Sequence, residues 1–248
     1  MITAKNYAAQ AQQAALKNSA TNEAAFTISR VIPISQHFAI PDGGKILDDG
    51  LRGLEGMDIN LPFPSVTVEC LCDGCKYCVI AIQHDSTVVI LFAVNTSGDW
   101  VIPDFSCVYK GLDRGEIHAE FTGKQAAVFQ DQPLIHFLAL TVLELCEALA
   151  CSNVDSEVIE SVDQRKNGKR IRQGKLPLYE TRRLVIKTPL ARSVGGCAEG
   201  GSGHRSPREH LRRGHVRMLS NGRRIWVNSC VVGNRANGVI NKSYGVTT

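Results

Sequence analysis

The chain has 248 residues, of which 44% are hydrophobic and 21% are charged. This composition is ordinary for a folded protein, and it excludes a wholly disordered chain and a fibrous repeat. Aromatic residues make up only 6%, so we expect a core built mainly from Val, Ile, Leu and Ala. The length suits one large domain or two small ones.

The net charge of +4 conceals a strong asymmetry along the chain. Residues 1–164 hold 9 Lys and Arg against 21 Asp and Glu, whereas residues 165–248 hold 19 against 3. A basic segment of this density favours an anionic partner, with nucleic acid first. The alternative is that the acidic part neutralises the basic part, within one chain or between two copies.

No stretch of the chain resembles an export signal or a membrane span. The N-terminus is rich in Ala and Gln, and the most apolar stretch, residues 134–151, carries His136, Glu144 and Glu147, which favours a buried helix. The nine cysteines are an odd number in a chain without an export signal, which is typical of a reducing compartment. We therefore expect a cytoplasmic protein with no membrane partner.

The first sixty residues contain one clear helical pattern. Residues 4–20 favour a helix through their Ala and Gln but hold few large apolar side chains, so residues 1–24 are predicted as an N-terminal peripheral helix or arm. Residues 25–40 contain β-branched runs broken by Pro33 and Pro41. Residues 41–60 are rich in Gly and Asp and indicate a loop.

Strand patterns begin at residue 65 and predict an antiparallel sheet. Residues 65–70 and 78–83 predict two strands around a tight Cys/Gly turn, and residues 87–94 and 100–102 continue the pattern. Residues 133–151 predict a long helix with apolar side chains on nearly every face. The expected fold class is α+β, with the sheet around this central buried helix in a core domain of residues 25–190.

The C-terminal part is predicted as a separate basic unit. Residues 163–177 are basic and turn-rich, and residues 184–187 indicate a strand. Residues 191–203 are a Gly-rich linker by composition, and residues 204–248 are predicted as a basic helix–hairpin module. Its hairpin is expected from strands at 215–219 and 223–232 around Ser220-Asn221-Gly222, with a final strand at 238–246.

The segment HRSPREHLRRGHVR at residues 204–217 is the most unusual chemically. It holds three His and five Arg, with Glu209 as its only acid, and Ser206-Pro207 predicts the start of a short helix. Guanidinium groups bind phosphate through paired hydrogen bonds, so the cluster favours contacts with a nucleic-acid backbone. The expected nucleic-acid-binding residues are Lys169, Arg170, Arg172, Lys175, Arg182, Arg183, Arg208, Arg212, Arg217, Arg223 and Arg224.

The same segment permits a second hypothesis, a toxin-like ribonuclease that needs no metal. His210 and His215 would act as base and acid, Arg213 would steady the phosphate, and Glu209 could replace one histidine. The simpler interpretation is that these histidines contact phosphate or pack at a turn. A third hypothesis is a protein–protein module, either a host-factor inhibitor or a homo-oligomer that pairs acidic and basic parts.

Four cysteines, Cys70, Cys72, Cys75 and Cys78, lie within nine residues. Cys72 and Cys75 form a CxxC pair at a turn, which resembles half of a zinc knuckle, but no second CxxC accompanies it. We therefore predict neither a metal nor a cofactor and interpret these cysteines as incidental to a hairpin. Zinc binding or redox chemistry is the alternative.

Several stretches resemble a family of accessory proteins from tailed bacteriophages and prophages. The distinctive stretch is HRSPREHLRRGHVRMLSNGRRIWVNSCVVG at residues 204–233, followed by KSYGV at 242–246. Further matching stretches are LPFPSVTVE at 61–69, ALACSNV at 148–154 and RIRQGKLPLYETRRLVI at 170–186. The family has no settled activity, so the resemblance implies a phage context in a bacterial host cell and no particular reaction. The leading hypothesis is a cytoplasmic phage accessory protein that binds nucleic acid through its basic C-terminal third.

Overall fold

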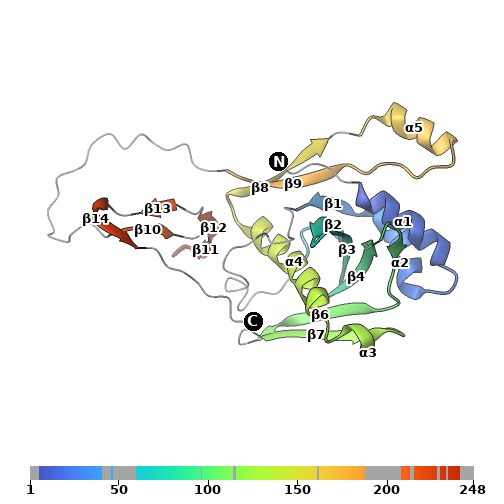
Figure 1. Ribbon diagram of the computed structural model, residues 1–248, viewed down its shortest axis with the longest axis horizontal. Helices are drawn as coiled ribbons and strands as arrows, with labels where there is room; N and C mark the ends of the chain where they lie inside the picture. The colour runs from blue at the N-terminus through green and yellow to red at the C-terminus, as the bar shows by residue number, and fades with distance from the viewer. Residues whose placement is uncertain are drawn as a thin grey trace.

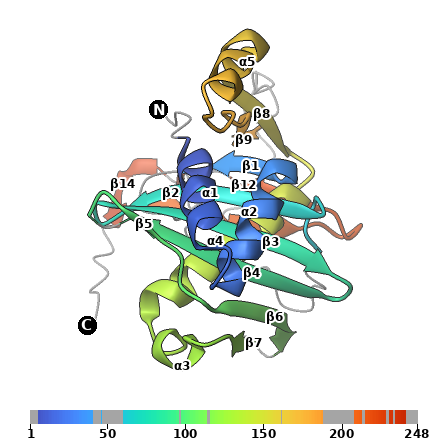
Figure 2. The ribbon, with the colours of Figure 1, turned by 90° about the vertical axis from the view of Figure 1, so that its right-hand side faces the viewer.

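A computed structural model describes residues 6–40, 46, 60–95, 97–113, 116–160, 162–187, 208–212, 215–227, 230–232 and 234–240. Its centre is one large sheet with helices on both faces (Figures 1 and 2). The α+β class expected from the sequence is therefore confirmed. The sheet is mixed, however, and not purely antiparallel.

Two N-terminal helices, α1 (Tyr7–Asn18) and α2 (Glu23–Val31), cover one face of the sheet (Figure 2). α1 packs closely, because its small side chains let the backbone approach the strands, and Ala8 and Ala11 are completely buried. The side chain of Asn22 accepts a hydrogen bond from Ala25 N (2.7 Å) and so begins α2.

The β-branched run after residue 25 is thus a helix over most of its length. It continues into a 3-10 helix η1 (Ile32–Ile34) and a four-residue strand β1 (Gln36–Ala39). Pro33 falls in the first turn of η1, where its missing N–H costs nothing.

β1 joins two antiparallel parts of the sheet. The remaining strands of this sheet are β2 (Ser65–Cys72), β3 (Cys75–His84), β4 (Thr87–Asn95), β5 (Trp100–Val101), β6 (Ser106–Asp113), β7 (Glu116–Thr122), β8 (Val154–Glu160) and β9 (Thr181–Ile186). The strand order is β7-β6-β4-β3-β2-β1-β9-β8, with β5 paired to β4. Both parallel pairings belong to β1, which lies between β2 and β9.

The long helix α4 (Pro133–Ala150) covers the other face of the sheet and follows a short helix, α3 (Ala126–Phe129). It matches the helix predicted at 133–151 and has Pro133 in its first turn. Within the described part of the chain, α4 alone is long and apolar enough to cross a membrane, and 56% of it is buried inside the protein.

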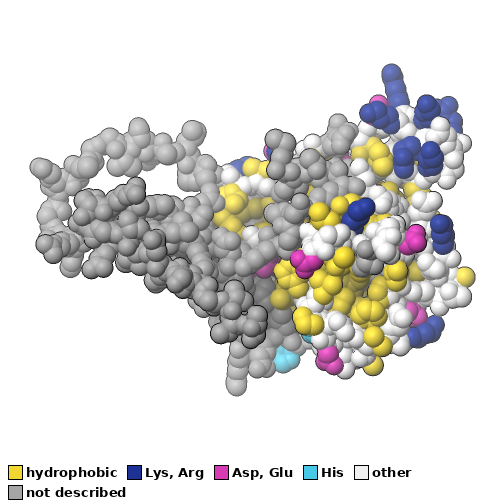
Figure 3. Space-filling view, in the orientation of Figure 1, with side chains coloured by type: hydrophobic (Ala, Val, Ile, Leu, Met, Phe, Trp, Pro, Cys, Tyr) yellow, Lys and Arg dark blue, Asp and Glu magenta, His cyan; other side chains and the backbone are white. Residues whose placement is uncertain are grey.

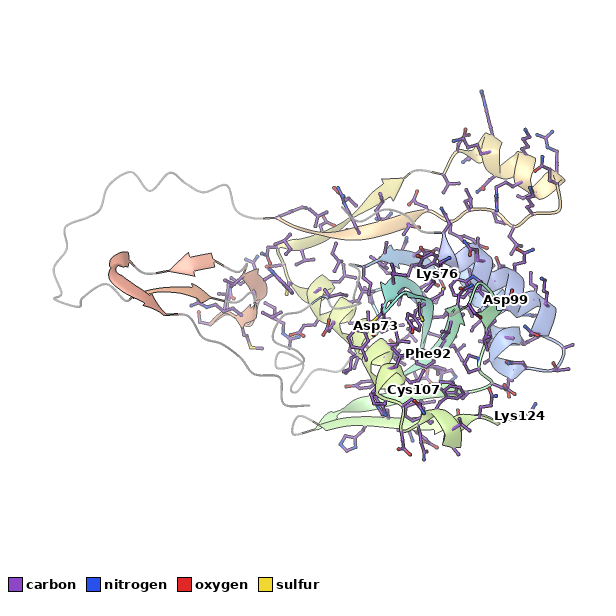
Figure 4. All side chains as sticks on the ribbon, in the orientation of Figure 1. Asp73, Lys76, Phe92, Asp99, Cys107 and Lys124 are labelled. Atoms are coloured by element: carbon purple, nitrogen blue, oxygen red, sulfur yellow. The ribbon has the colours of Figure 1, made fainter. Side chains whose placement is uncertain are left out.

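The central strands are buried on both faces, which explains their nearly continuous apolar runs. Phe92 and Cys107, labelled in Figure 4, belong to the cluster between the sheet and α4, together with Leu138. Ile80 and Leu91 point the opposite way and pack in the cluster beneath α1 and α2. The protein therefore has two apolar layers with one sheet between them.

The basic segment after β8, which was predicted to be turn-rich, contains a helix, α5 (Gln164–Arg172). Farther along, β10 (Arg208–Arg212), β13 (Cys230–Val232) and β14 (Asn234–Ile240) form a three-stranded sheet. β11 (His215–Met218) and β12 (Arg224–Val227) form the hairpin predicted around residues 220–222. The Gly-rich linker at 191–203 and the end of the predicted final strand, residues 241–246, lie outside the described residues.

The prediction of a short helix after Ser206 is wrong. Residues 208–212 form β10, which pairs antiparallel with β13 and parallel with β14. The β-branched run in Cys230–Val232 offers these residues a ladder of backbone hydrogen bonds, and this non-local pairing outweighs the local capping signal.

A tight contact at Gly123 fixes the chain between β7 and α3. Gly123 has φ 113°, and a Cβ atom there would lie 2.6 Å from the carbonyl oxygen of Asp104 and 2.7 Å from Cα of Phe105. Gln125 N donates to the same Asp104 oxygen over 3.1 Å. A side chain at residue 123 would therefore push apart two backbone segments that the fold holds together.

We expect Gly123→Ala to lower the free energy of unfolding by about 2–4 kcal/mol in urea titrations, because it adds a backbone clash to an unfavourable φ. The matched control is Gly98→Ala, at φ 101° with no atom within 4 Å, which should cost only about 1–2 kcal/mol of backbone strain. Equal losses in the two variants would show that the contact with Asp104 is unimportant.

Candidate nucleic-acid interface

α5 stands away from the sheet, at the far end of the two-stranded ribbon formed by β8 and β9 (Figures 1 and 2). The ribbon pairs Val154 with Ile186 at one end and Glu160 with Thr181 at the other, where α5 is inserted. None of the nine residues of α5 is buried. We call residues 163–178 the basic arm.

Both ends of α5 are capped, which matters because a nine-residue helix is marginal in water. At the start, the Asp163 carboxylate accepts a hydrogen bond from Arg165 N (2.8 Å). At the end, Gly174 adopts φ 70° and donates to Ile171 O, while Lys175 N donates to Arg170 O, both over 2.9 Å. These two bonds form the Schellman pattern that ends many helices.

The chain that leaves α5 is tied back onto the helix. The Asn167 side chain accepts from Leu178 N (2.8 Å) and donates to Leu178 O (2.9 Å). Arg170 Nε donates to Leu176 O (3.0 Å). The basic arm is therefore one locally ordered unit, built without burial in the core.

The arm gathers positive charge on an exposed surface, as the dark blue side chains over α5 in Figure 3 show. All of its six basic side chains are exposed except that of Arg170, which is half-buried. They are Arg165, Lys166, Lys169, Arg170, Arg172 and Lys175. Among the residues that the structure describes, no carboxylate forms an ion pair with any of them.

The basic side chains of β9 are used differently. Arg183 pairs with Glu157 across the ribbon, and Lys187 Nζ lies 2.6 Å from Asp155 Oδ2. The hydrogen bond from Lys187 lowers the pKa of Asp155. Arg182 lies 3.5 Å from Glu180 and is half-buried. Within the ribbon, acidic and basic parts of the chain thus neutralise each other.

The β11–β12 hairpin docks on the core where α4 leads into β8. Ser152 N donates to Arg224 O (2.9 Å). The Asn153 side chain donates to Trp226 O (2.8 Å) and accepts from Trp226 N (2.7 Å). Trp226 is half-buried and lines an apolar cavity of about 160 Å³. The cavity is also lined by Ala39, Ile40, Ile46, Ala148, Val154, Leu184 and Ile186.

Arg224 faces an acidic pair on α4. Glu147 and Glu144 are only 1% and 8% exposed, and Glu144 Oε2 accepts from Ile46 N over 2.8 Å. Burial raises the pKa of Glu147 from 4.5 to about 7; the nearby Arg224 opposes the rise and Glu144 adds to it. Arg224 therefore makes a contact within the protein, whereas Arg217 and Arg223 on the same hairpin are exposed.

Six of the eleven predicted binding residues lie on two exposed surfaces. Lys169, Arg170, Arg172 and Lys175 lie on the basic arm, and Arg217 and Arg223 lie on the hairpin. The hairpin docks beside Val154, whereas the arm begins beyond Glu160. At about 3.3 Å per residue, the ribbon alone is roughly 20 Å long, so the two surfaces lie at least that far apart.

The predicted catalytic residues His210 and His215 lie on two different strands, and their pairing as base and acid stays a prediction. His210 lies in β10, opposite Val232, and His215 lies in β11, opposite Val227, and these strands belong to different sheets. Glu209, Arg208 and Arg212 also belong to β10. Arg213 lies outside the described residues.

The four clustered cysteines do not converge. Cys72 and Cys75 are cross-strand partners that flank the turn between β2 and β3. Cys70 is buried in the cluster beneath α4, whereas Cys78 is buried in the cluster beneath α1 and α2. The described residues contain no group of three or more His, Cys, Asp or Glu side chains placed to hold a metal ion.

Some functional candidates were missed from the sequence. Arg165 and Lys166 precede Lys169 and Arg170 by four residues, a helical spacing that could have revealed them. The sequence pattern predicts a turn-rich segment there instead of a helix. The pair Glu144 and Glu147, three residues apart in an apolar helix, could likewise have indicated a buried site.

No known protein family, curated protein or solved structure matches this chain. The resemblance to phage accessory proteins therefore stays a prediction that rests on the motifs quoted above.

The hairpin interface predicts a specific pH dependence. Because the folded-state pKa of Glu147, about 7, exceeds 4.5, the folded protein binds more protons than the unfolded chain between these values. The stability associated with protonated Glu147 is fully present below about pH 4.5 and is lost as the pH rises towards 7. As the pH rises from 5 to 8, we expect the unfolding free energy of the native protein to fall by roughly 1–3 kcal/mol more than that of Glu147→Gln.

The measurement is urea denaturation of the two proteins across this pH range. Glu120→Gln is the control, because Glu120 is an exposed carboxylate whose pKa is lowered by its hydrogen bond to Lys110. That variant should not reproduce the effect. A difference between native protein and Glu147→Gln that stays constant with pH would contradict the assigned role of Glu147.

Proposed function

We propose that this protein binds nucleic acid and that the basic arm is its main contact with the phosphate backbone. The observation that carries the proposal is a capped, exposed helix whose six-cation arm has no ion-pair partner among the described residues. Arg165, Lys169 and Arg172 are spaced at i, i+4 and i+7, so they share one face of the helix. A single polyanion can contact all three.

Electrostatics favours such a partner over a small acidic ligand. Like charges on one short helix repel each other, and the repulsion weakens when a polyanion replaces the surrounding counterions. Binding then releases counterions from the nucleic acid, which supplies a large, salt-dependent part of the affinity. The β8–β9 ribbon has its charges already paired and would contribute less.

The arm is better suited to phosphates than to bases. Residues 163–178 contain no aromatic side chain that could stack on a base. The nearest aromatic residue along the chain, Tyr179, is stacked on His37 with 4.6 Å between the ring centroids. Arginine and lysine contacts to phosphate fix position without reading sequence. We therefore propose binding with little sequence preference.

The exposed Arg217 and Arg223 on the hairpin add a second contact to this proposal. At a rise of 3.4 Å per base pair, the ribbon between hairpin and arm corresponds to about six base pairs, so a longer duplex is needed to span both surfaces. We therefore expect duplexes much longer than six base pairs to bind more tightly than shorter ones. The resemblance of residues 204–233 adds to the proposal a phage setting in the cytoplasm of a bacterial host.

The test compares the native protein with Arg165→Gln/Lys169→Gln/Arg172→Gln on labelled duplex DNA, duplex RNA and single strands. We expect binding of the triple variant to fall at least about tenfold at 50 mM salt. The slope of log K against log salt should become shallower by up to about 3, since each lost phosphate contact removes about 0.9.

The matched control removes three positive charges elsewhere, at Lys17, Lys110 and Lys124 on the core. Equal losses in both triple variants would reduce the interaction to net charge and refute the specific role of the arm. If the native protein does not bind any of these nucleic acids at low salt, the proposal is refuted and the protein–protein hypothesis is favoured. EDTA in every reaction also tests the ribonuclease hypothesis, which requires RNA cleavage that His210→Ala abolishes.

A further inference from the structure

The CxxC pair lies at a tight hairpin turn on the core, and the proposed nucleic-acid contacts leave it unused. Cys72 ends β2, Cys75 begins β3, and the two residues are direct cross-strand partners. Between them, Asp73 at φ 48° and Gly74 at φ 76° form a two-residue turn with both central residues left-handed. Asp73 is labelled in Figure 4.

This register places the two cysteines at a distance that a disulfide can span. Directly opposed residues in antiparallel strands have Cα atoms about 4.5–5.5 Å apart. Disulfides join Cα atoms about 4.4–6.8 Å apart. Both thiols are free and half-buried, so a small reagent can reach them. Bond formation needs little movement of the backbone.

The neighbouring cysteines are less well placed. Cys70 pairs with Tyr77 across the strands and lies diagonally from Cys75, about 7–8 Å away by sheet geometry and beyond disulfide reach. Cys78 pairs with Glu69 and is buried on the opposite face of the sheet. Of the four clustered thiols, only those of Cys72 and Cys75 oppose each other.

We propose that Cys72 and Cys75 form a reversible dithiol site that a low-molecular-weight disulfide, of the glutathione class, oxidises to an intramolecular disulfide. One protein thiolate attacks the small disulfide, breaks its S–S bond and releases one small thiol, leaving a mixed disulfide. The second protein thiolate attacks the protein sulfur of that bond and releases the second small thiol. Two electrons and two protons pass from the protein to the small disulfide.

The local chemistry makes the site slow at neutral pH. Burial, and after it the charge of Asp73, raises the pKa of the Cys72 thiol. The thiolate is the attacking form, so exchange accelerates as the pH rises. Lys76, which follows Cys75 in β3, has its Nζ 5.8 Å from the centroid of the Tyr7 ring at the start of α1. A disulfide would thus join β2 and β3 directly beside this contact with α1.

The experiment treats the full chain with oxidised glutathione at pH 8, alkylates the remaining thiols and measures intact mass and peptide maps. We expect the native protein to lose two hydrogen atoms and two alkylation sites, both restored by dithiothreitol. Cys70→Ser should behave like the native protein. Cys72→Ser and Cys75→Ser should each stop at a mixed disulfide with glutathione.

Three results would overturn the proposal. The first is a stable glutathione adduct on Cys72 or Cys75 of the native protein, and the second is a disulfide that includes Cys70 or Cys78. The third is that Cys72 and Cys75 do not react in the folded protein although they react fully in the unfolded protein. The last comparison uses the same chain in urea, so it separates protection by the fold from a failure of the reagent. The readout does not involve nucleic acid and stands independently of the proposed binding function.

Discussion

The attachment of the basic arm to the rest of the protein depends on β1, a strand of only four residues. β1 lies between β2 and β9 and is parallel to both, so it joins the antiparallel strands β2 to β7 to the ribbon that carries α5. Phe38 faces the layer beneath α4, while His37 faces the other side, between Thr67 and Thr181. Parallel neighbours on both sides leave a strand buried, and β1 accordingly has hardly any exposed surface.

His37 shows how this junction is held together. Its ring is 3% exposed and stacks on Tyr179 in the segment that leads from the arm into β9. The Tyr179 hydroxyl donates to Gln12 on α1, and Gln12 donates to Ser29 O on α2 over 3.1 Å. Burial lowers the pKa of His37 to about 4, so the ring is neutral near pH 7 and places no unpaired charge in the core. One short polar chain thus connects the N-terminal helices, the central strand and the base of the arm.

Ion pairs within the protein explain why only some basic side chains are available to a partner. In the ribbon, cross-strand pairs such as Arg183 with Glu157 use up the charge, and on the hairpin Arg224 is turned towards buried Glu147. Asp163 starts the arm as a helix cap, and no further acid follows until Glu180. The unpaired basic side chains are therefore concentrated on α5, which projects from the sheet, and they are the dark blue group over α5 in Figure 3.

Local pattern determined the α+β class, the helix at residues 133–151 and the strands at 65–102, because hydrophobic periodicity and turn chemistry act between near neighbours. It also identified the basic third of the chain and the hairpin at residues 220–222. Only the tertiary structure decided that residues 208–212 form a strand, that β1 runs parallel to β2 and β9, and that Arg224 faces inward. Each of these features depends on a partner at least eighteen residues away, and the energy of such pairing cannot be read from the local spacing of residues.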